Sequence, residues 1–491
     1  MELKPSQIPS EVSRVTKTLE EAGYEAYVVG GCVRDLLLGR KPKDWDVTTN
    51  ATPDDIQRLF EHTYYTNEFG TVGVVNDDAE NEALKIVEVT PYRLEGSYSD
   101  ARRPDNVTFS QNIEDDLKRR DFTINALAYN ASQGRLIDLY DGVKDISSGV
   151  VRAVGDARLR FDEDALRILR AVRLSAQLGF EIEERTGKAI TNAAPQLEKI
   201  SEERIRDEFV RIIESDSPMQ ALITAKNLGI LGYIIPELLD GVGVEQNQAH
   251  SYDVWEHNIR SAQHAADKKW PFTVRLAALL HDIGKPATRR RDNTKGDWTF
   301  HGHDVVGAKM TKKRLKELKF PKEIVDIVST LVRWHMFFSD PDQVTLSAVR
   351  RIIVNVGREH IDELIQLRIC DRIGTGRPKE QPFRLRKYQA MIDEALRDPI
   401  TVGMLKLDGK GLMETTGEKP GPRLGWMLHA LLEEVLDDPE KNTVEYLSGR
   451  SQEMAKLTDE ELRPLGEAGK EKQAEVEEAE IKDIHKKHFV D

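Results

Sequence analysis

The alternation of hydrophobic and polar positions divides this chain into a front part with β-prone runs and a long part with helical spacing. Residues 1 to about 22 have the spacing of an amphipathic helix, and short apolar runs at 27–29, 71–75 and 84–89 follow among turn residues. After Val151 these strand signals fade and helical periodicity dominates. The pattern predicts an α/β head with a small mixed sheet, followed by an all-α remainder.

Two later segments have clear helical character. Residues 163–179 carry apolar side chains at helical intervals and end at a glycine, which predicts one continuous helix over this range. From about Ser451 the chain is rich in Glu, Lys and Ala, which indicates a solvated helix or a partly disordered tail.

Length and composition narrow the classes of protein. A chain of 491 residues is too long for one ordinary core, so about three or four structural units are expected. Cys32 and Cys370 are the only cysteines, which excludes a disulfide framework and a thiolate zinc cluster. Without an apolar run long enough for a bilayer or a signal-peptide pattern at the start, we expect a cytoplasmic protein with no membrane partner.

The net charge of −14 is unusual for a protein that binds nucleic acid. Charge is segregated along the chain, however. The tail is acidic, whereas basic clusters occur at 102–103, 118–120, 289–291 and 312–314. A basic cluster is usually a solvated surface, but it can also bind phosphates locally in an acidic protein.

The most informative segment lies at residues 26–46. A β-prone run ends at Gly30-Gly31, and a helical stretch from Val33 to Leu38 follows, with Gly39 as its stop. Glycines at such a junction allow an anion to approach free backbone N–H groups. Shortly after it, Asp44 and Asp46 flank Trp45, and strand alternation would place both carboxylates on one face.

Each feature alone is common, but their order and closeness predict chemistry. Two carboxylates supply the hard oxygen ligands that Mg²⁺ prefers. A triphosphate, Mg²⁺ and two aspartates are the components of nucleotidyl transfer. Glu88, in an apolar run, is a possible third ligand or a buried structural glutamate. Arg34 could pair with Asp35 or contact the triphosphate.

These residues resemble a known family. Gly-Gly-x-Val-Arg-Asp followed by Asp-x-Asp is similar to the class II tRNA nucleotidyltransferase and bacterial poly(A) polymerase superfamily. Segments at 119–126, 163–167 and 203–208 resemble further motifs of that superfamily, and 100–105 corresponds to its mobile loop. The resemblance implies a nucleotidyltransferase head at 1–150, a helical neck and nucleobase-recognition region at 151–240, a helical HD module at 241–380 and a helical C-terminal region with an acidic tail at 381–491.

The resemblance also implies roles for individual side chains. Asp44 and Asp46 would be catalytic, and Asp121 would contact the 2′-hydroxyl of the nucleotide. Asp164 and Arg167, three residues apart, would share a helix face and read the edge of the base, although such a pair is often only a salt bridge. The residues expected to bind nucleotide are Gly30, Gly31, Arg34, Arg119, Arg120, Asp121, Asp164 and Arg167. Four charged residues would instead brace the neck helices: Glu203, Arg204, Arg206 and Glu208.

A second set of residues resembles the HD phosphohydrolase superfamily. Histidines and aspartates on successive helices can hold one or two divalent metals and leave positions open for water. The set follows the order of that superfamily: His257, His281, Asp282, His303, His335 and Asp371. His250 and His301 are weaker candidates.

The leading hypothesis is an enzyme that adds C, C and A to the 3′ end of tRNA from CTP and ATP with Mg²⁺. An A-adding enzyme and a poly(A) polymerase are alternatives, whereas the intact segment at 100–105 disfavours CC-only addition. A different class of hypothesis is an HD phosphohydrolase with an inactive head. A noncatalytic RNA-binding protein would require both metal sites to be silent.

Overall fold

The computed structural model describes residues 3–66, 70–95, 107–247, 250–294, 296–337, 344–397 and 401–490. The segment at 100–105 therefore lies outside the described residues. The chain forms two compact units, one of Met1–His335 with Gln366–Pro378 and one of Met336–Ile365 with Lys379–Asp491. In the described parts, no helix combines the length and apolar character that crossing a membrane requires.

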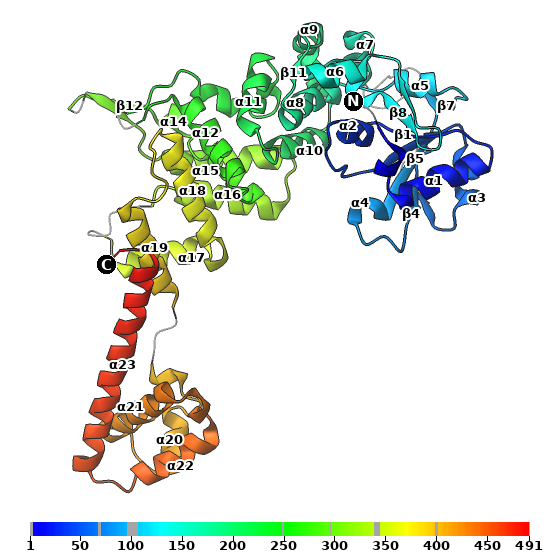
Figure 1. Ribbon diagram of the computed structural model, residues 1–491. Helices are drawn as coiled ribbons and strands as arrows, with labels where there is room; N and C mark the ends of the chain where they lie inside the picture. Colours follow the sequence, from blue (N-terminus) through cyan, green and yellow to red (C-terminus); the bar gives the residue numbers. More distant parts are fainter. Residues whose placement is uncertain are drawn as a thin grey trace. The chain divides into compact units, whose positions relative to one another are not determined.

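A mixed sheet of seven strands forms the head of the first unit (Figure 1). The strand order is β3-β4-β5-β2-β1-β8-β9, and only β2 and β5 run parallel. The bounds are β1 Ala26–Val29, β2 Asp46–Thr49, β3 Thr63–Tyr65, β4 Val72–Val75, β5 Ile86–Pro91, β8 Leu127–Asn130 and β9 Arg135–Asp138. β2 and β5 are central strands, and their valines Val47, Val87 and Val89 are fully buried, whereas Ile86 at the start of β5 is exposed. The predicted α/β head is confirmed.

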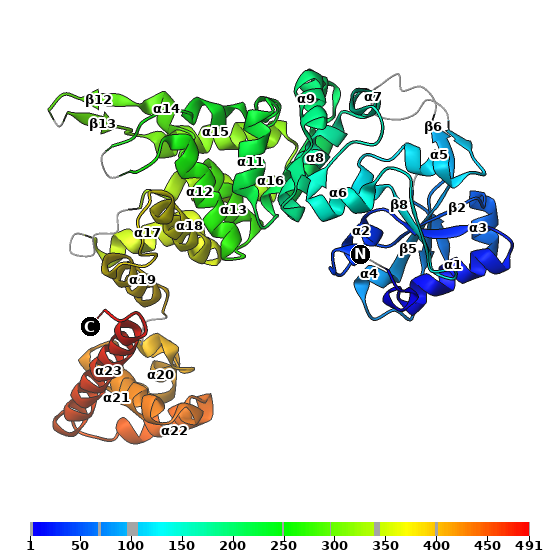
Figure 2. The ribbon, with the colours of Figure 1, turned by 45° about the horizontal axis from the view of Figure 1, so that its top comes forward.

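Short helices surround this sheet, as Figure 2 shows for α1 and α3. The predicted lead-in helix is shorter than expected and follows a 3₁₀ turn at Pro5–Gln7. The predicted helix after Gly30 is confirmed, and Gly39 ends it with a φ of +68°. The helices of the head are α1 Ser10–Glu21, α2 Gly31–Leu37, α3 Pro53–Leu59, α4 Glu82–Lys85 and α5 Ile113–Lys118, and a small ribbon pairs β6 Arg93–Glu95 with β7 Val107–Phe109.

Two predicted boundaries were wrong. Leu84 and Lys85 lie in α4 rather than in a strand, because the Asn81 side chain accepts a hydrogen bond from the Ala83 N–H and starts a helical turn. The helix expected over 163–179 is interrupted at Asp164, which has an extended backbone between α7 Ala157–Glu163 and α8 Leu166–Leu178. Its predicted end at Gly179 is correct, with a φ of +72°.

The rest of the first unit is helical, apart from a short pair of parallel strands, β10 Val150–Val151 and β11 Glu181–Ile182, and a hairpin of β12 Arg290–Asp292 and β13 Asp297–Thr299. Strongly apolar α13 is buried between α12 and α16. The helices are α6 Gly142–Ser148, α9 Glu184–Ala193, α10 Glu202–Ile213, α11 Pro218–Asn227, α12 Val254–Asp267, α13 Phe272–Leu280, α14 Lys285–Thr288, α15 His303–Glu317, α16 Lys322–Trp334 and α18 Ile361–Gly374, whose first residues belong to the second unit.

The second unit is also helical, with α17 Leu346–Val356, α19 Phe383–Leu396, α20 Gly409–Thr416, α21 Pro422–Asp437, α22 Val444–Met454 and α23 Asp459–Lys487. The tail forms a helix, as one of the two predicted alternatives required. It is not solvated on all sides, because Leu462, Gly466 and Gly469 are buried where α23 packs on α21. At Gly469 a Cβ atom would lie 2.1 Å from the carbonyl oxygen of His429, so the two backbones meet without room for a side chain.

Candidate active site and metal centre

The glycine junction lies between β1 and α2, where the sequence predicts it. Gly30 has φ +84° and ψ −136°, a backbone conformation that side-chain-bearing residues rarely adopt. A Cβ atom there would lie 2.9 Å from Nη1 of Arg120 and 3.7 Å from Oδ2 of Asp46. Gly30 therefore borders both the predicted arginine and the predicted carboxylate, which brings three sequence-predicted residues together.

The carboxylates come next. Asp46 begins β2, and its Cα is paired in register with that of Glu88 on parallel β5. Asp44 precedes the strand and is exposed, so the strand-alternation argument for it was wrong. Burial raises the pKa of Asp46 to about 6, with Arg120 opposing the shift and Glu88 and Asp44 adding to it. Burial and the charge of Asp44 also raise the pKa of Glu88.

The carboxylates of Asp44, Asp46 and Glu88 therefore lie close enough to repel one another. Their oxygen donors suit a hard divalent cation, whose charge would remove the penalty on the ionised forms. In the described residues they do not form one of the tight ligand groups, which lie in the helical part of the unit. Glu88 is half-buried beside Asp46, a position compatible with a third ligand.

A polar network connects Arg34 with Asp121. Arg34 pairs with Asp35 at 2.7 Å and donates through Nη1 to Oδ1 of Asn125 at 2.6 Å. Asn125 donates through Nδ2 to Oδ1 of Asp121 at 3.1 Å, and Arg170 pairs with Oδ2 of Asp121 at 2.6 Å. Burial opposes ionisation of Asp121, but Arg170 outweighs it and lowers the pKa of this carboxyl.

Sequence reasoning missed Asn125 and Arg170. Asn125 is an amide residue in the mostly apolar stretch that follows Asp121, and it is buried. Arg170 follows Arg167 by three residues, so both lie on the same side of α8. Those two signals were available in the sequence.

Arg119 and Arg120 both pair with Asp116, which is fully buried. Arg119 Nε donates to Oδ1 of Asp116 at 2.9 Å, and Arg120 Nη2 donates to Oδ2 at 3.0 Å. This carboxylate, which was not singled out from the sequence, fixes both guanidinium groups. Arg120 then lies between Asp116 and the glycine junction.

Asp164 and Arg167 do not share one helix face, because the helix breaks at Asp164. Each is held by its own partner instead. Arg167 Nη1 donates to Oε2 of Glu163 at 2.6 Å, and Arg204 pairs with Asp164 at 2.8 Å. Asp164 and Arg167 therefore do not form the salt bridge with each other that was the alternative interpretation of this pair.

The four charged residues of the neck lie on α10. Arg204 holds Asp164, and Glu208 pairs with Arg173 of α8 at 2.9 Å. Arg206 pairs with Asp207 at 2.8 Å, and Glu203 lies in the first turn of the helix. Arg204 and Glu208 thus contact neighbouring segments, as bracing residues would.

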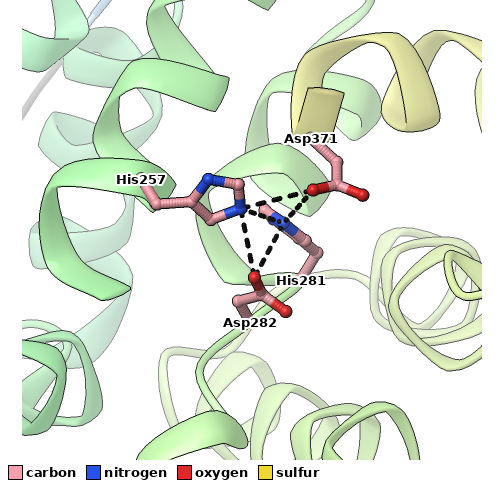
Figure 3. A group of neighbouring side chains, drawn as sticks. All are labelled: His257, His281, Asp282 and Asp371. Carbon is pink, nitrogen blue, oxygen red and sulfur yellow. Dashed lines mark hydrogen bonds and ion pairs between the residues drawn. The ribbon is translucent and has the colours of Figure 1, made fainter. Parts of the chain in front are cut away.

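The HD residues converge in the helical part of the first unit. Figure 3 shows His257, His281, Asp282 and Asp371 facing one another. Their ligand atoms lie within 4.8 Å of one another, as do those of Asp282, His303 and His335. His257 Nε2 is 3.1 Å from Oδ2 of Asp282, and His303 Nε2 is 3.2 Å from Oδ1. Asp282 therefore belongs to both groups and points one oxygen at each.

Backbone carbonyls orient the imidazoles. Nδ1 of His281 lies 2.9 Å from the carbonyl of Ala278, and the corresponding Nδ1 atoms of His303 and His335 lie 2.7 Å from carbonyls three residues earlier. These contacts leave Nε2 facing the cluster, as in metal sites. The buried donor set of imidazoles and carboxylates fits one or two divalent transition metals.

The protonation states of the residues in this cluster depend on one another. Burial opposes protonation of His281, but Asp282 and Asp371 raise its pKa to about 10. Burial also opposes ionisation of Asp282, but His281 and Lys285 hold its pKa well below the usual range. Lys285, missed in the sequence, lies 2.6 Å from Oδ2 of Asp282 and donates to Gln246.

The two weaker histidines differ. His250 has its ring 5.5 Å from that of His257, and burial, followed by the charge of Lys285, lowers its pKa to about 3, so it is a neutral neighbour. His301 is exposed and belongs to neither ligand group.

Comparison with known proteins agrees with this arrangement. Residues 26–152 match the poly A polymerase head domain, 179–241 match a probable RNA and SrmB-binding site of polymerase A, and 249–376 match the HD domain. The CCA-adding enzyme of Lactobacillus delbrueckii subsp. bulgaricus is 34% identical over 443 residues, which cover 90% of this chain and 97% of the relative. That of Leuconostoc mesenteroides is 42% identical over 280 residues, 55% of this chain and 68% of the relative.

Solved structures give the same result. The Bacillus stearothermophilus CCA-adding enzyme in complex with CTP superposes with a TM-score of 0.58 at 27% identity, covering 91% of this chain and 97% of that one. A similarity that extends over nearly the whole length includes both the head and the helical part. The chain therefore belongs to the CCA-adding enzyme family.

Proposed function

We propose that this chain adds C, C and A to the 3′ end of tRNA from CTP and ATP, in the cytoplasm, with Asp44 and Asp46 as the catalytic Mg²⁺ ligands and Glu88 as a third carboxylate beside them. The observation that carries the proposal is the register of Asp46 with Glu88 directly next to Gly30, in a chain whose relatives over nearly the full length are CCA-adding enzymes. A-only addition and poly(A) synthesis are not favoured by those relatives.

The residues of the head would divide the work of positioning. Mg²⁺ bound by these carboxylates would activate the attacking 3′-hydroxyl and neutralise the triphosphate. The side-chain-free surface of Gly30 leaves space for the triphosphate, and Arg120, fixed by Asp116, offers a cation at its edge. Asp121, kept ionised by Arg170, would accept a hydrogen bond from the 2′-hydroxyl of the sugar.

Base selection would use Asp164 and Arg167 as two separately held groups. The guanidinium of Arg167 is fixed by Glu163 and by the carbonyl of Arg119, so its remaining donors have a set direction. Asp164, held by Arg204, supplies an acceptor. A donor and an acceptor on separate supports can adjust independently to the edges of C and A.

The test uses purified protein, tRNA that lacks its CCA end, and each nucleoside triphosphate. Sequencing of the extended 3′ ends should give CCA with CTP and ATP together, and CC with CTP alone. Asp46→Ala should abolish addition, whereas Asp78→Ala, an exposed loop aspartate, should not. Failure of the wild-type protein to extend any tRNA would refute the proposal.

A second activity is supported by the convergence of five other candidate ligand residues on Asp282. We infer that the HD module binds divalent metal and hydrolyses phosphoesters. In this second activity, Lys285 beside Asp282 would contact a phosphate oxygen of the substrate. Hydrolysis of phosphomonoesters or cyclic nucleotides should survive Asp44→Ala and disappear with Asp282→Asn, which should also lower the bound metal measured by elemental analysis. Metal content unchanged in Asp282→Asn would contradict the site.

A further inference from the structure

Helix α15 has an outward face rich in lysines, with one exposed acid, Glu317, at its end. Four of them are exposed at spacings of three, one and three residues: Lys309, Lys312, Lys313 and Lys316. At 3.6 residues per turn they lie on one side of the helix. The buried side, with His303, Gly307, Thr311 and Leu315, lies opposite. We call the four the lysine stripe.

The stripe is costly for an isolated helix. Lysines three or four residues apart repel one another, by about 0.2–0.5 kcal/mol for each such pair, and the stripe contains four such spacings. Lys312 pairs with Asp326 at 3.0 Å and Lys313 with Glu317 at 3.8 Å. Within the described residues, Lys309 and Lys316 form no ion pair. The fold of α15 does not need these charges, because its buried side already packs on α16.

The chemistry of the stripe favours a polyanion. The exposed large hydrophobic residues of the described chain do not include any between 303 and 322, so nothing on this face would insert into a lipid layer. Lysines bind phosphates as point charges, and phosphate contacts supply affinity and orientation without sequence specificity. Because the chain has a net charge of −14, a stripe of this kind is a local attraction for phosphates in a protein with an excess of acidic residues.

We propose that the lysine stripe of α15 binds the phosphate backbone of the tRNA whose 3′ end is extended in the head. This inference rests on the proposed function, because it takes the tRNA substrate from it. The stripe would contribute to tRNA affinity, but not to nucleotide binding or to chemistry.

The test replaces all four lysines with glutamine. The variant should show a KM for tRNA raised about tenfold or more, with kcat and the KM for CTP unchanged. The salt dependence of tRNA binding should become shallower by about 0.7–0.9 per lost phosphate contact. Thermal stability should change little, since the removal of like-charge repulsion offsets the loss of the surface ion pairs of Lys312 and Lys313. Replacing the same lysines with arginine should restore tRNA affinity.

A matched control removes four exposed lysines of the head instead, Lys4, Lys17, Lys85 and Lys144. If both quadruple variants raise the KM for tRNA equally, net charge alone explains the effect and the inference is wrong. An unchanged KM for tRNA and an unchanged salt slope in the α15 variant would also overturn the inference. So would a variant that binds tRNA normally but no longer binds phosphatidylserine vesicles, because the stripe would then recognise a lipid surface. Absence of nucleotide addition by the wild-type protein would instead refute the proposed function.

Discussion

Replacing Gly30 with alanine should impair this protein in a measurable and specific way. The backbone of Gly30 has φ +84° and ψ −136°, close to a region that only glycine adopts readily. Residues held in such regions cost about 1–3 kcal/mol. The new Cβ would also lie 2.9 Å from Nη1 of Arg120, which would have to move away from the glycine junction. We therefore expect Gly30→Ala to carry a free-energy penalty of about 1–3 kcal/mol relative to the wild-type protein.

That free energy can appear in either of two measurements. If the backbone keeps its conformation, the free energy of unfolding in urea falls by this amount. If the junction relaxes instead, the stability is retained and kcat/KM for CTP addition falls about 5- to 150-fold, since about 1.4 kcal/mol corresponds to a factor of ten. Both quantities should be measured on the same preparation.

Gly31→Ala is the matched control. Gly31 is the first residue of α2, and a Cβ there would have only the flexible Arg34 side chain nearby, at 3.6 Å. Alanine is favourable in a helix, so stability should change by less than about 1 kcal/mol. If Gly30→Ala were as stable as Gly31→Ala and as active as the wild-type protein, the argument from the glycine junction would be wrong.

Three further predictions concern other parts of the chain. Asp46→Asn should abolish nucleotide addition. It should nevertheless raise the free energy of unfolding of the metal-free protein by about 1–3 kcal/mol at pH 8. The reason is that the pKa of Asp46 is raised to about 6, so its ionised form is penalised in the folded state. This gain in stability should vanish below about pH 4, where the carboxyl is protonated in the folded and the unfolded protein. Denaturation in EDTA at both pH values measures the gain. A gain that does not depend on pH would contradict ionisation of Asp46 as its cause. Asn125→Asp keeps an acceptor for Arg34 but removes the donor to Asp121 and adds a like charge, so the preference for CTP over dCTP, measured as a ratio of kcat/KM, should fall about tenfold; an unchanged ratio would mean that Asn125 does not position Asp121. Gly469→Ala should lower the melting temperature of the C-terminal helical unit at a cost of about 1–3 kcal/mol, whereas Gly449→Ala, with nothing within 4 Å, should not; equal melting temperatures would refute the close contact of α23 with α21.

The fold and much of the site were predictable where local chemistry is decisive. Gly30 and Gly39 punctuate α2 because their backbone conformations suit glycine, and the strand before them is short and apolar. The break at Asp164 could not be predicted from periodicity, because the apolar spacing continues across it. It depends on distant groups, including Arg204, which binds the Asp164 side chain from 40 residues away.

The same distinction applies to the functional side chains. The order of the HD residues along the chain gave the cluster, but not the division into two groups around Asp282. Asn125 was missed because its partner Arg34 lies 91 residues away and meets it only in the folded chain. Asp116 was missed although its partners Arg119 and Arg120 follow it by three and four residues.

The pairing of β2 with β5 makes the chemistry of the head depend on its hydrophobic core. Val87 and Val89 are fully buried, and Glu88 between them faces the other way, opposite Asp46. A slip of one residue would expose both valines and carry the glutamate to the wrong side, so the hydrophobic effect enforces the meeting of two acids that repel each other. Substitutions that weaken the packing of Val87 and Val89 should therefore reduce activity before they unfold the protein.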